Sequence, residues 1–176
     1  MSRYVALLRA INVGKRQVPM SDLKALANEL GLANARTYLA SGNLLFETDK
    51  PPAWAETQLE AALEQRFGFN VEVMVRSQAQ WADYARGNPM PRESEASPNL
   101  VMISVGKRDA TDADLTQLRK KAGSNERVER VGPNIWLFFG DGAGRSKLGL
   151  GPKTEVRTTR NWRSIIKINQ LLGNEE

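Results

Sequence analysis

Apolar residues in the first 76 positions alternate between the spacing of strands and the spacing of helices. Strand patterns occur at 4–9, 35–40, 44–47 and 71–75, and helical patterns occur at 20–30 and 52–67. Glycines directly after the helical patterns are typical helix stops. The resulting order, βαββαβ, is that of the ferredoxin-like fold. We therefore predict a ferredoxin-like unit over residues 1–76.

The second half repeats part of this pattern. Residues 77–99 are predicted to form a helical linker and a proline-rich loop, and a strand pattern begins at residue 100. Thr111 and Asp114 have the spacing of a capping box, which predicts the start of a helix. A hairpin pattern around 132–134 and an apolar helical pattern near the C-terminus follow.

No closing strand is predicted in this half, so residues 100–176 are expected to form a βαββ unit with C-terminal helices. The fold class is therefore α+β, with a ferredoxin-like βαββαβ unit followed by a second, partly similar unit. That second unit carries a glycine-rich loop and a basic C-terminal helix. The two units are expected to pack together, and the pattern leaves open whether they form one compact domain.

The chain contains no cysteine and no histidine. The missing cysteine excludes thiolate nucleophiles, iron–sulfur clusters and zinc-finger sites, and the missing histidine removes the commonest general base and metal ligand. No metal-binding pattern is present, and no cofactor is predicted. Any catalysis must use carboxylates, lysine, serine, threonine or tyrosine, and the sequence does not decide whether the protein is an enzyme.

The N-terminal residues enter a strand pattern directly, without an apolar leader. No apolar run reaches the roughly 20 residues of a membrane-spanning helix. With 26% charged and 41% hydrophobic residues, the composition is typical of a globular protein. We therefore expect a cytoplasmic protein with no membrane partner.

The positive charge of the chain is concentrated in one segment. The formal net charge is +5 and the isoelectric point is about 9.7. Residues 143–172 contain seven basic residues and a single acid, Glu155, so this segment carries +6 and the rest of the chain −1. Such a segment can attract an anion, or it can be a solvated helix face.

Strand order in a βαββαβ unit brings two polar segments together. The first and second strands run parallel with the third between them, so the end of the first strand and the turn after the second share one sheet edge. The residues expected at this edge are Arg9, Asn12, Gly14, Lys15, Ser41 and Asn43. They form a cluster of hydrogen-bond donors suited to an anion, and the adjoining helix N-terminus adds a positive dipole. The alternative is that these glycines and asparagines serve turn geometry.

A glycine-rich loop at 140–147 ends in Arg145, Ser146 and Lys147. A Walker loop places lysine and then serine or threonine directly after its last glycine, so this order argues against a Walker NTPase. A looser nest of backbone N–H groups with these side chains could hold one phosphate or carboxylate. The alternative is a flexible connector with solvated charges.

Residues 157–162 are predicted to lie just before and inside the start of the last helix, with a threonine as N-cap. Basic residues at a helix N-terminus oppose the helix dipole, at a cost of about 0.3–1 kcal/mol each. Arg157, Arg160 and Arg163 are therefore unfavourable there unless Glu155 or a bound anion compensates them. This is a further indication of a ligand.

Five motifs, in order along nearly the whole chain, resemble the bacterial domain of unknown function 1697 family: residues 7–14, 20–23, 37–38 with 41–43, 144–148 and 158–162. The resemblance implies a ferredoxin-like α+β fold in a bacterial cytosolic protein. It carries no established activity, cofactor or catalytic residue. Two residues depart from the family's pattern, in which glycine is usual at the positions of Ala10 and Lys15.

We predict that the protein binds a small ligand bearing a phosphate or carboxylate group. The predicted ligand-binding residues are Arg9, Asn12, Gly14, Lys15, Ser41, Asn43, Arg145, Ser146, Lys147, Thr159, Arg160 and Asn161. Two alternatives stay open: a weak, salt-dependent nucleic-acid binder through residues 143–172, and an enzyme acting on a phosphorylated or carboxylated substrate. The sequence does not predict the oligomeric state, or whether the N-terminal cluster and the basic segment form one site.

Overall fold

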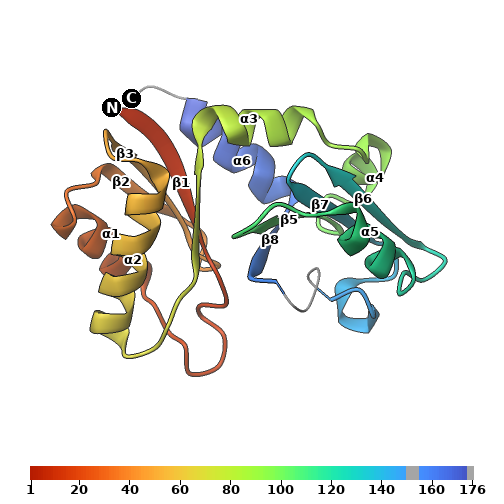
Figure 1. Cartoon of the computed structure of the whole chain (residues 1–176), viewed down its shortest axis with the longest axis horizontal. Coiled ribbons are helices and arrows are strands. Elements are labelled where there is room, and N and C mark those ends of the chain that lie inside the picture. The colour runs from red at the N-terminus through yellow and green to blue at the C-terminus, as the bar shows by residue number, and fades with distance from the viewer. Residues whose placement is uncertain (150–154, 174–176) are drawn as a thin grey trace. The chain divides into compact units, whose positions relative to one another are not determined.

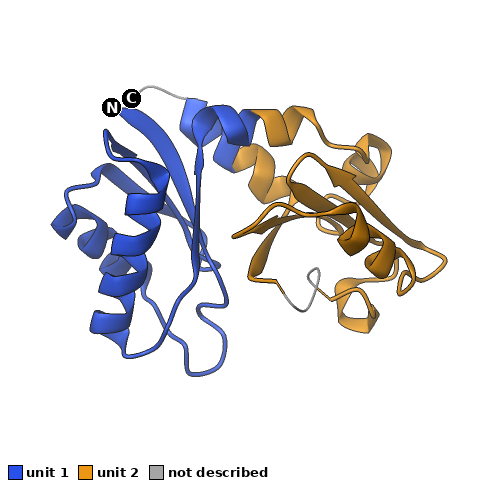
Figure 2. Ribbon diagram, viewed as in Figure 1, with its two compact units in different colours: residues 1–82, 168–176 blue, residues 83–167 orange. Residues whose placement is uncertain are grey.

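The computed structural model describes residues 1–149 and 155–173. It divides into two compact units, unit 1 formed by Met1–Ala82 and Ile168–Glu176 and unit 2 formed by Asp83–Lys167 (Figure 2). The unit boundaries fall within two helices, α3 (Gln78–Arg86) and α6 (Trp162–Gly173). The C-terminal turn of α6 therefore belongs to unit 1.

Unit 1 has the ferredoxin-like fold (Figure 1). Its elements are β1 (Ser2–Leu8), α1 (Met20–Glu29), β2 (Ala33–Tyr38), β3 (Asn43–Thr48), α2 (Pro52–Phe67) and β4 (Val73–Ser77). The sheet has the strand order β2-β3-β1-β4, and each neighbouring pair is antiparallel. The predicted βαββαβ order is confirmed.

Apolar residues along β1 are buried on both faces of this sheet. Ala6 and Leu8 belong to the core that α1 and α2 cover, together with Leu59 of α2. Because successive strand residues point to opposite faces, Val5 and Leu7 lie on the other face, where they are also fully buried. Burial on both faces explains why β1 has a continuous apolar sequence instead of an alternating one.

Two N–H groups of β4 are covered by side chains of the neighbouring helix α2. Glu60 Oε1 accepts the N–H of Val73 at 2.9 Å, and Glu56 Oε1 accepts the N–H of Val75 at 2.8 Å. Glu56 and Glu60 are four residues apart in α2, so their carboxylates lie on one face of the helix. They satisfy N–H groups that an edge strand otherwise presents to another chain.

Unit 2 contains a second four-stranded antiparallel sheet. Its elements are α4 (Pro91–Ala96), β5 (Val101–Gly106), α5 (Asp112–Arg119), β6 (Glu126–Val131), β7 (Asn134–Phe139), the 3₁₀ turn η1 (Ala143–Arg145) and β8 (Arg157–Asn161). The strand order β6-β7-β5-β8 matches that of unit 1. Within the described ranges, no helix is long and apolar enough to cross a membrane.

The strand β8 corrects the sequence prediction, which placed residues 157–162 at the start of the last helix and gave unit 2 no closing strand. Its residues pair with β5, with Arg157 opposite Gly106 and Asn161 opposite Met102. Helix α6 begins directly after it, and Asn161 Oδ1 accepts the N–H of Ser164 at 3.0 Å, as an N-cap does. The strand has no apolar alternation, so nothing local marks it as a strand.

Helix α5 begins with the capping box that the sequence predicts. Thr111 Oγ1 accepts the N–H of Asp114 at 3.2 Å, and Asp114 Oδ2 accepts the N–H of Thr111 at 2.9 Å. Arg108 donates to both carboxylate oxygens of Asp114, at 3.1 and 3.2 Å. Burial alone raises the pKa of Asp114, but these hydrogen bonds outweigh it and hold the pKa below its usual value.

We expect Asp114→Asn to lower the free energy of unfolding by about 1 kcal/mol at neutral pH, and to flatten its dependence on acid pH. The carboxyl has a lower pKa in the folded protein than the unfolded value of about 3.9, so its contribution is complete above that value. The contribution is lost as the pH falls through the folded pKa. Urea unfolding at a series of pH values measures both effects. Thr111→Ala, which keeps the carboxylate, should lose stability but retain most of the pH dependence.

Candidate functional site

Two loops of unit 1 meet at one edge of the sheet, as the strand order predicts. The first comprises residues 9–19, between β1 and α1, and the second comprises residues 39–43, between β2 and the start of β3. The N–H of Leu8 donates to the carbonyl of Gly42 at 2.9 Å, and Asn12 Nδ2 donates to the carbonyl of Ala40 at 2.6 Å. We call residues 9–19 and 39–43 together the loop edge.

The asparagines of the loop edge hold the two loops in place. Asn12 Nδ2 also donates to the carbonyl of Val18 at 3.0 Å, and its Oδ1 accepts the N–H of Val18 at 2.8 Å. Asn43 is fully buried, and its Nδ2 donates to the carbonyl of Tyr38 at 2.7 Å and to Ser41 Oγ at 3.4 Å. These amides already have protein partners. Of the donors predicted from the sequence, those that face solvent are therefore mainly the cations Arg9 and Lys15.

The first loop ends in a tight turn that exposes Lys15. The N–H of Arg16 donates to the carbonyl of Val13 at 3.1 Å, with Gly14 and Lys15 as the central residues of the turn. Gly14 has φ +56°, which only glycine adopts without strain. The Gly14–Lys15 turn is exposed, and glycine at its first central position is typical of a type II′ turn.

The neighbouring arginine has a structural role that the sequence analysis did not predict. Arg16 donates from Nε to the carbonyl of Ala10 at 2.8 Å and from Nη2 to the carbonyl of Asn70 at 2.7 Å. Its guanidinium also lies 4.8 Å from the centre of the Phe69 ring. It therefore ties the first loop to the segment before β4. No sequence signal distinguishes it from Arg9, which is exposed.

Backbone strain is concentrated in the loop edge. Ala10, Asn12 and Leu39 have φ of +53°, +55° and +61°, and they are three of the four non-glycine residues with positive φ in the described ranges. Such a conformation costs about 1–2 kcal/mol for an ordinary side chain. The positive φ at Ala10 also gives a physical reason for the glycine usual there in the family's pattern.

The same loops carry excess positive charge. Residues 9–19 include Arg9, Lys15 and Arg16, and neither loop contains aspartate or glutamate. Glu72 lies beside this cluster, because its carbonyl accepts the N–H of Arg9 at 2.9 Å, and it adds one negative charge. Positive φ occurs at every second residue, Ala10, Asn12 and Gly14, but the N–H of Asn12 already donates to the carbonyl of Arg16 at 2.7 Å.

The predicted residues of the glycine-rich loop lie in unit 2. Arg145 ends η1, Ser146 Oγ accepts the N–H of Leu148 at 3.0 Å, and Leu148 is buried in the core beside α5. Arg145 and Lys147 are exposed. Residues 150–154, which follow this loop in the sequence, lie outside the described residues. The loop edge belongs to unit 1, whereas Arg145, Ser146 and Lys147 belong to unit 2.

Arg160 and its neighbours form part of β8 and not of a helix start, so the argument from the helix dipole no longer applies to Arg157 and Arg160. Arg160 is 6% exposed and donates from Nη1 to Thr158 Oγ1 at 2.9 Å and to the carbonyl of Thr159 at 2.7 Å. Burial lowers the pKa of Arg160 to about 10, so its guanidinium stays charged at neutral pH. Asn161 caps α6.

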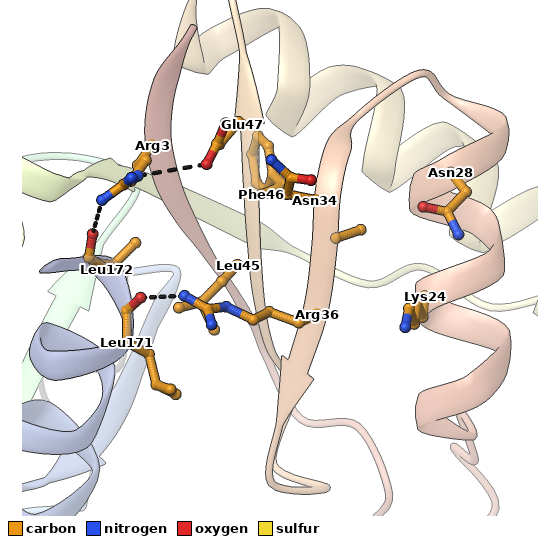
Figure 3. A pocket seen from close by; sticks show the side chains of 11 residues that line it. Arg3, Lys24, Asn28, Asn34, Arg36, Leu45, Phe46, Glu47, Leu171 and Leu172 are labelled. Carbon is orange, nitrogen blue, oxygen red and sulfur yellow. Dashed lines mark hydrogen bonds and ion pairs between the residues drawn. The ribbon is translucent and has the colours of Figure 1, made fainter. Parts of the chain in front are cut away.

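A pocket of about 720 Å³ lies in unit 1, and none of the predicted residues lines it (Figure 3). It is lined by Arg3, Lys24, Asn28, Asn34, Ala35, Arg36, Leu45, Phe46, Glu47, Leu171 and Leu172. Arg3 Nη1 donates to the carbonyl of Leu172 at 3.1 Å, and Arg36 donates to the carbonyl of Leu171, so both arginines contact the end of α6. The polar lining residues are spread over four elements, and no spacing along the chain could have revealed them.

The comparison with protein families gives one assignment. The model of the family described as "Protein of unknown function (DUF1697)" matches residues 1–136. The chain belongs to this family. The match includes both the loop edge and the α1, β2 and β3 residues of the pocket, and it ends within β7.

The structure is similar to that of the conserved bacterial protein SP0830 from Streptococcus pneumoniae, with a TM-score of 0.78. The two sequences are 22% identical, and the alignment covers 99% of each chain. This likeness supports the two-unit α+β fold. A comparison with curated proteins finds no match. In the described part of the chain, no three acidic side chains cluster in a way that could hold a metal ion.

Proposed function

We propose that this protein binds a small ligand bearing a phosphate or carboxylate group at the loop edge of unit 1. The observation that carries the proposal is the joining of two strained loops through Asn12, of which the first is basic and neither contains an acid. Arg9 and Lys15 supply the exposed positive charge.

The energetics favour an anion over a neutral ligand. A charge-assisted hydrogen bond contributes about 1.5–3 kcal/mol, roughly twice a neutral one. The strained residues Ala10, Asn12 and Leu39 are held by surrounding hydrogen bonds and so cost nothing further when a ligand arrives. A rigid, pre-formed loop also loses little conformational entropy on binding.

The nucleic-acid alternative has less support than the sequence suggested. Among the six described basic residues between 143 and 172, Arg157 and Arg160 are 4% and 6% exposed, so two of these six cations are withdrawn from phosphate contacts. RNA recognition through a ferredoxin-like sheet also needs an accessible sheet face with aromatic residues. In unit 1 the face opposite α1 and α2 contacts the C-terminal turn of α6 through Arg3.

Titration of the full chain with inorganic phosphate, followed by amide NMR spectra, tests the proposal. We expect saturable shifts of the amides of residues 9–15 and 39–42, and a loss of affinity of about tenfold or more in Lys15→Gln and in Arg9→Ala. Lys121→Gln, which removes an exposed lysine from unit 2, is the matched control and should leave the affinity unchanged.

Two results would overturn the proposal. One is the absence of saturable shifts in the loop edge with phosphate and with a panel of small carboxylates. The other is oligonucleotide binding at moderate salt that survives Arg9→Ala and Lys15→Gln but is lost when Arg145, Lys147 and Arg163 are neutralised. That second outcome would support the nucleic-acid alternative.

A further inference from the structure

The pocket of unit 1 offers chemistry that the loop edge does not. We propose that it is a separate binding site for a small organic molecule that carries an oxyanion, a carboxylate or phosphate ester, next to hydroxyl or carbonyl groups. Its volume of about 720 Å³ is within the range of pockets that bind small molecules. The inference stands independently of the proposed function, because the residues that line the pocket are not those of the loop edge.

Positive charge predominates in the lining. The lining contains three cations, Arg3, Lys24 and Arg36, and one carboxylate, Glu47, whose Oε1 lies 3.4 Å from Arg3 Nε. Arg3 is thus partly neutralised within the protein. Lys24 is exposed and, among the described residues, its ammonium has no hydrogen-bond acceptor or ion-pair partner. Lys24 therefore supplies excess charge to an incoming oxyanion.

Two amides of the pocket are available to a ligand. Asn28 follows Lys24 by four residues in α1, so both lie on one side of the helix, the side toward β2 (Figure 3). Asn34 lies on β2, which also lines the pocket. Within the described ranges, neither amide makes a hydrogen bond to the protein. This contrasts with Asn12 and Asn43, whose amides are used to hold loops together.

The backbone of β2 favours a small molecule over an added peptide strand. The register of β2 against β3 shifts between Ala33 and Arg36, and Asn34 within this bulge has φ +51°. A bulge interrupts the regular row of N–H and C=O groups that strand addition requires. Asn34 is also the fourth non-glycine residue with positive φ in the described part of the chain, so all four belong to the loop edge or this pocket.

An oxyanion in this pocket would compete with the end of α6. Arg36 donates to the carbonyl of Leu171, a neutral acceptor, and charged oxygens accept stronger hydrogen bonds from a guanidinium. Ligand binding is therefore expected to draw the Arg36 guanidinium from Leu171. The amide NMR signals of the last turn of α6 should shift when this happens.

The test uses the full chain and four probes: inorganic phosphate, glucose 6-phosphate, citrate and, as an uncharged control, glucose. Amide NMR spectra locate the bound probe. We expect glucose 6-phosphate or citrate to shift residues 24–36 and 171–172 saturably, and glucose to cause no such shift. Tighter binding of glucose 6-phosphate would indicate a phosphate site, and tighter binding of citrate would indicate a carboxylate site.

Two variants are expected to leave the fold intact, because both replaced side chains are exposed. Lys24→Gln removes an exposed charge, and Asn34→Gly removes the amide while keeping a residue that tolerates positive φ. Each should weaken pocket binding about ten- to hundredfold without lowering the thermal midpoint. Lys15→Gln is the cross-control, because it should weaken binding at the loop edge only. Saturable shifts confined to residues 9–15 and 39–42, or no saturable shifts with any charged probe, would overturn the inference.

Discussion

Replacing Arg157 with methionine is expected to lower the free energy of unfolding by about 3–5 kcal/mol. The guanidinium of Arg157 is buried and donates from Nε to Ser104 Oγ at 3.0 Å and from Nη2 to the carbonyl of Ser104 at 2.9 Å. It also donates to the carbonyls of Arg108 at 3.2 Å and Pro133 at 3.3 Å. Methionine fills similar space but makes none of these bonds, so buried acceptors from three segments of unit 2 lose a donor.

Arg163→Met is the matched control for this prediction. Arg163 lies six residues further along and is exposed, so the same change of charge should alter stability by no more than about 0.5 kcal/mol. Urea unfolding followed by the fluorescence of tryptophan, including the buried Trp136 of unit 2, measures both variants. Equal losses in the two variants would contradict the role of Arg157 as a buried cross-link.

The fold of unit 1 could be predicted because its apolar residues follow the spacing of strands and helices closely. The continuous apolar run of β1 and the helical spacing of α1 and α2 leave few other ways to bury these residues. The polar loops then follow from topology, since β3 lies between β1 and β2. This is why the meeting of Asn12 with the 39–42 turn could be predicted without coordinates.

The strand β8 could not be predicted for the opposite reason. Its burial depends on partners far away in the sequence, such as Ser104 and Pro133, which satisfy the guanidinium of Arg157. Read locally, a stretch rich in arginine and threonine is typical of a solvated helix start. A buried arginine is stable only when carbonyls and hydroxyls converge on it, and that convergence is a property of the fold.

The roles of the asparagines follow the same logic. The sequence shows which side chains can donate hydrogen bonds but not which donors the protein uses itself. Asn12 and Asn43 were predicted as ligand donors, and each has backbone partners within 3.0 Å. Asn28 and Asn34 could not be predicted as ligand donors. Asn28 lies on an ordinary helix surface, and Asn34 lies in a strand whose bulge has no sequence signal. The positive charge of the loop edge could be inferred from the sequence, whereas the hydrogen-bond partners of its donors could not.

The second large effect on stability is expected from a substitution in the glycine-rich loop of unit 2. Gly140→Ala is expected to lower the free energy of unfolding by about 3 kcal/mol, because an added Cβ would lie 2.9 Å from Asn125 Cβ and closer still to the Asn125 carbonyl oxygen. The obstacle is backbone, which cannot move aside as a flexible side chain can. Asn125 is also held by Asp141, since its Nδ2 donates to Asp141 Oδ2 at 3.0 Å. Gly140 is therefore required for close packing of two chain segments.

Gly144→Ala separates this packing role from a role in anion binding. Gly144 belongs to the same loop, but no atom lies within 4 Å of its added Cβ, so alanine should be neutral or stabilise the protein by up to about 1 kcal/mol. Thermal unfolding without added ligand compares the two variants directly. If Gly140→Ala were as well tolerated as Gly144→Ala, the packing of Gly140 against Asn125 would not explain the glycine. A loss confined to Gly140→Ala would mean that this glycine, at least, serves the fold rather than a phosphate nest.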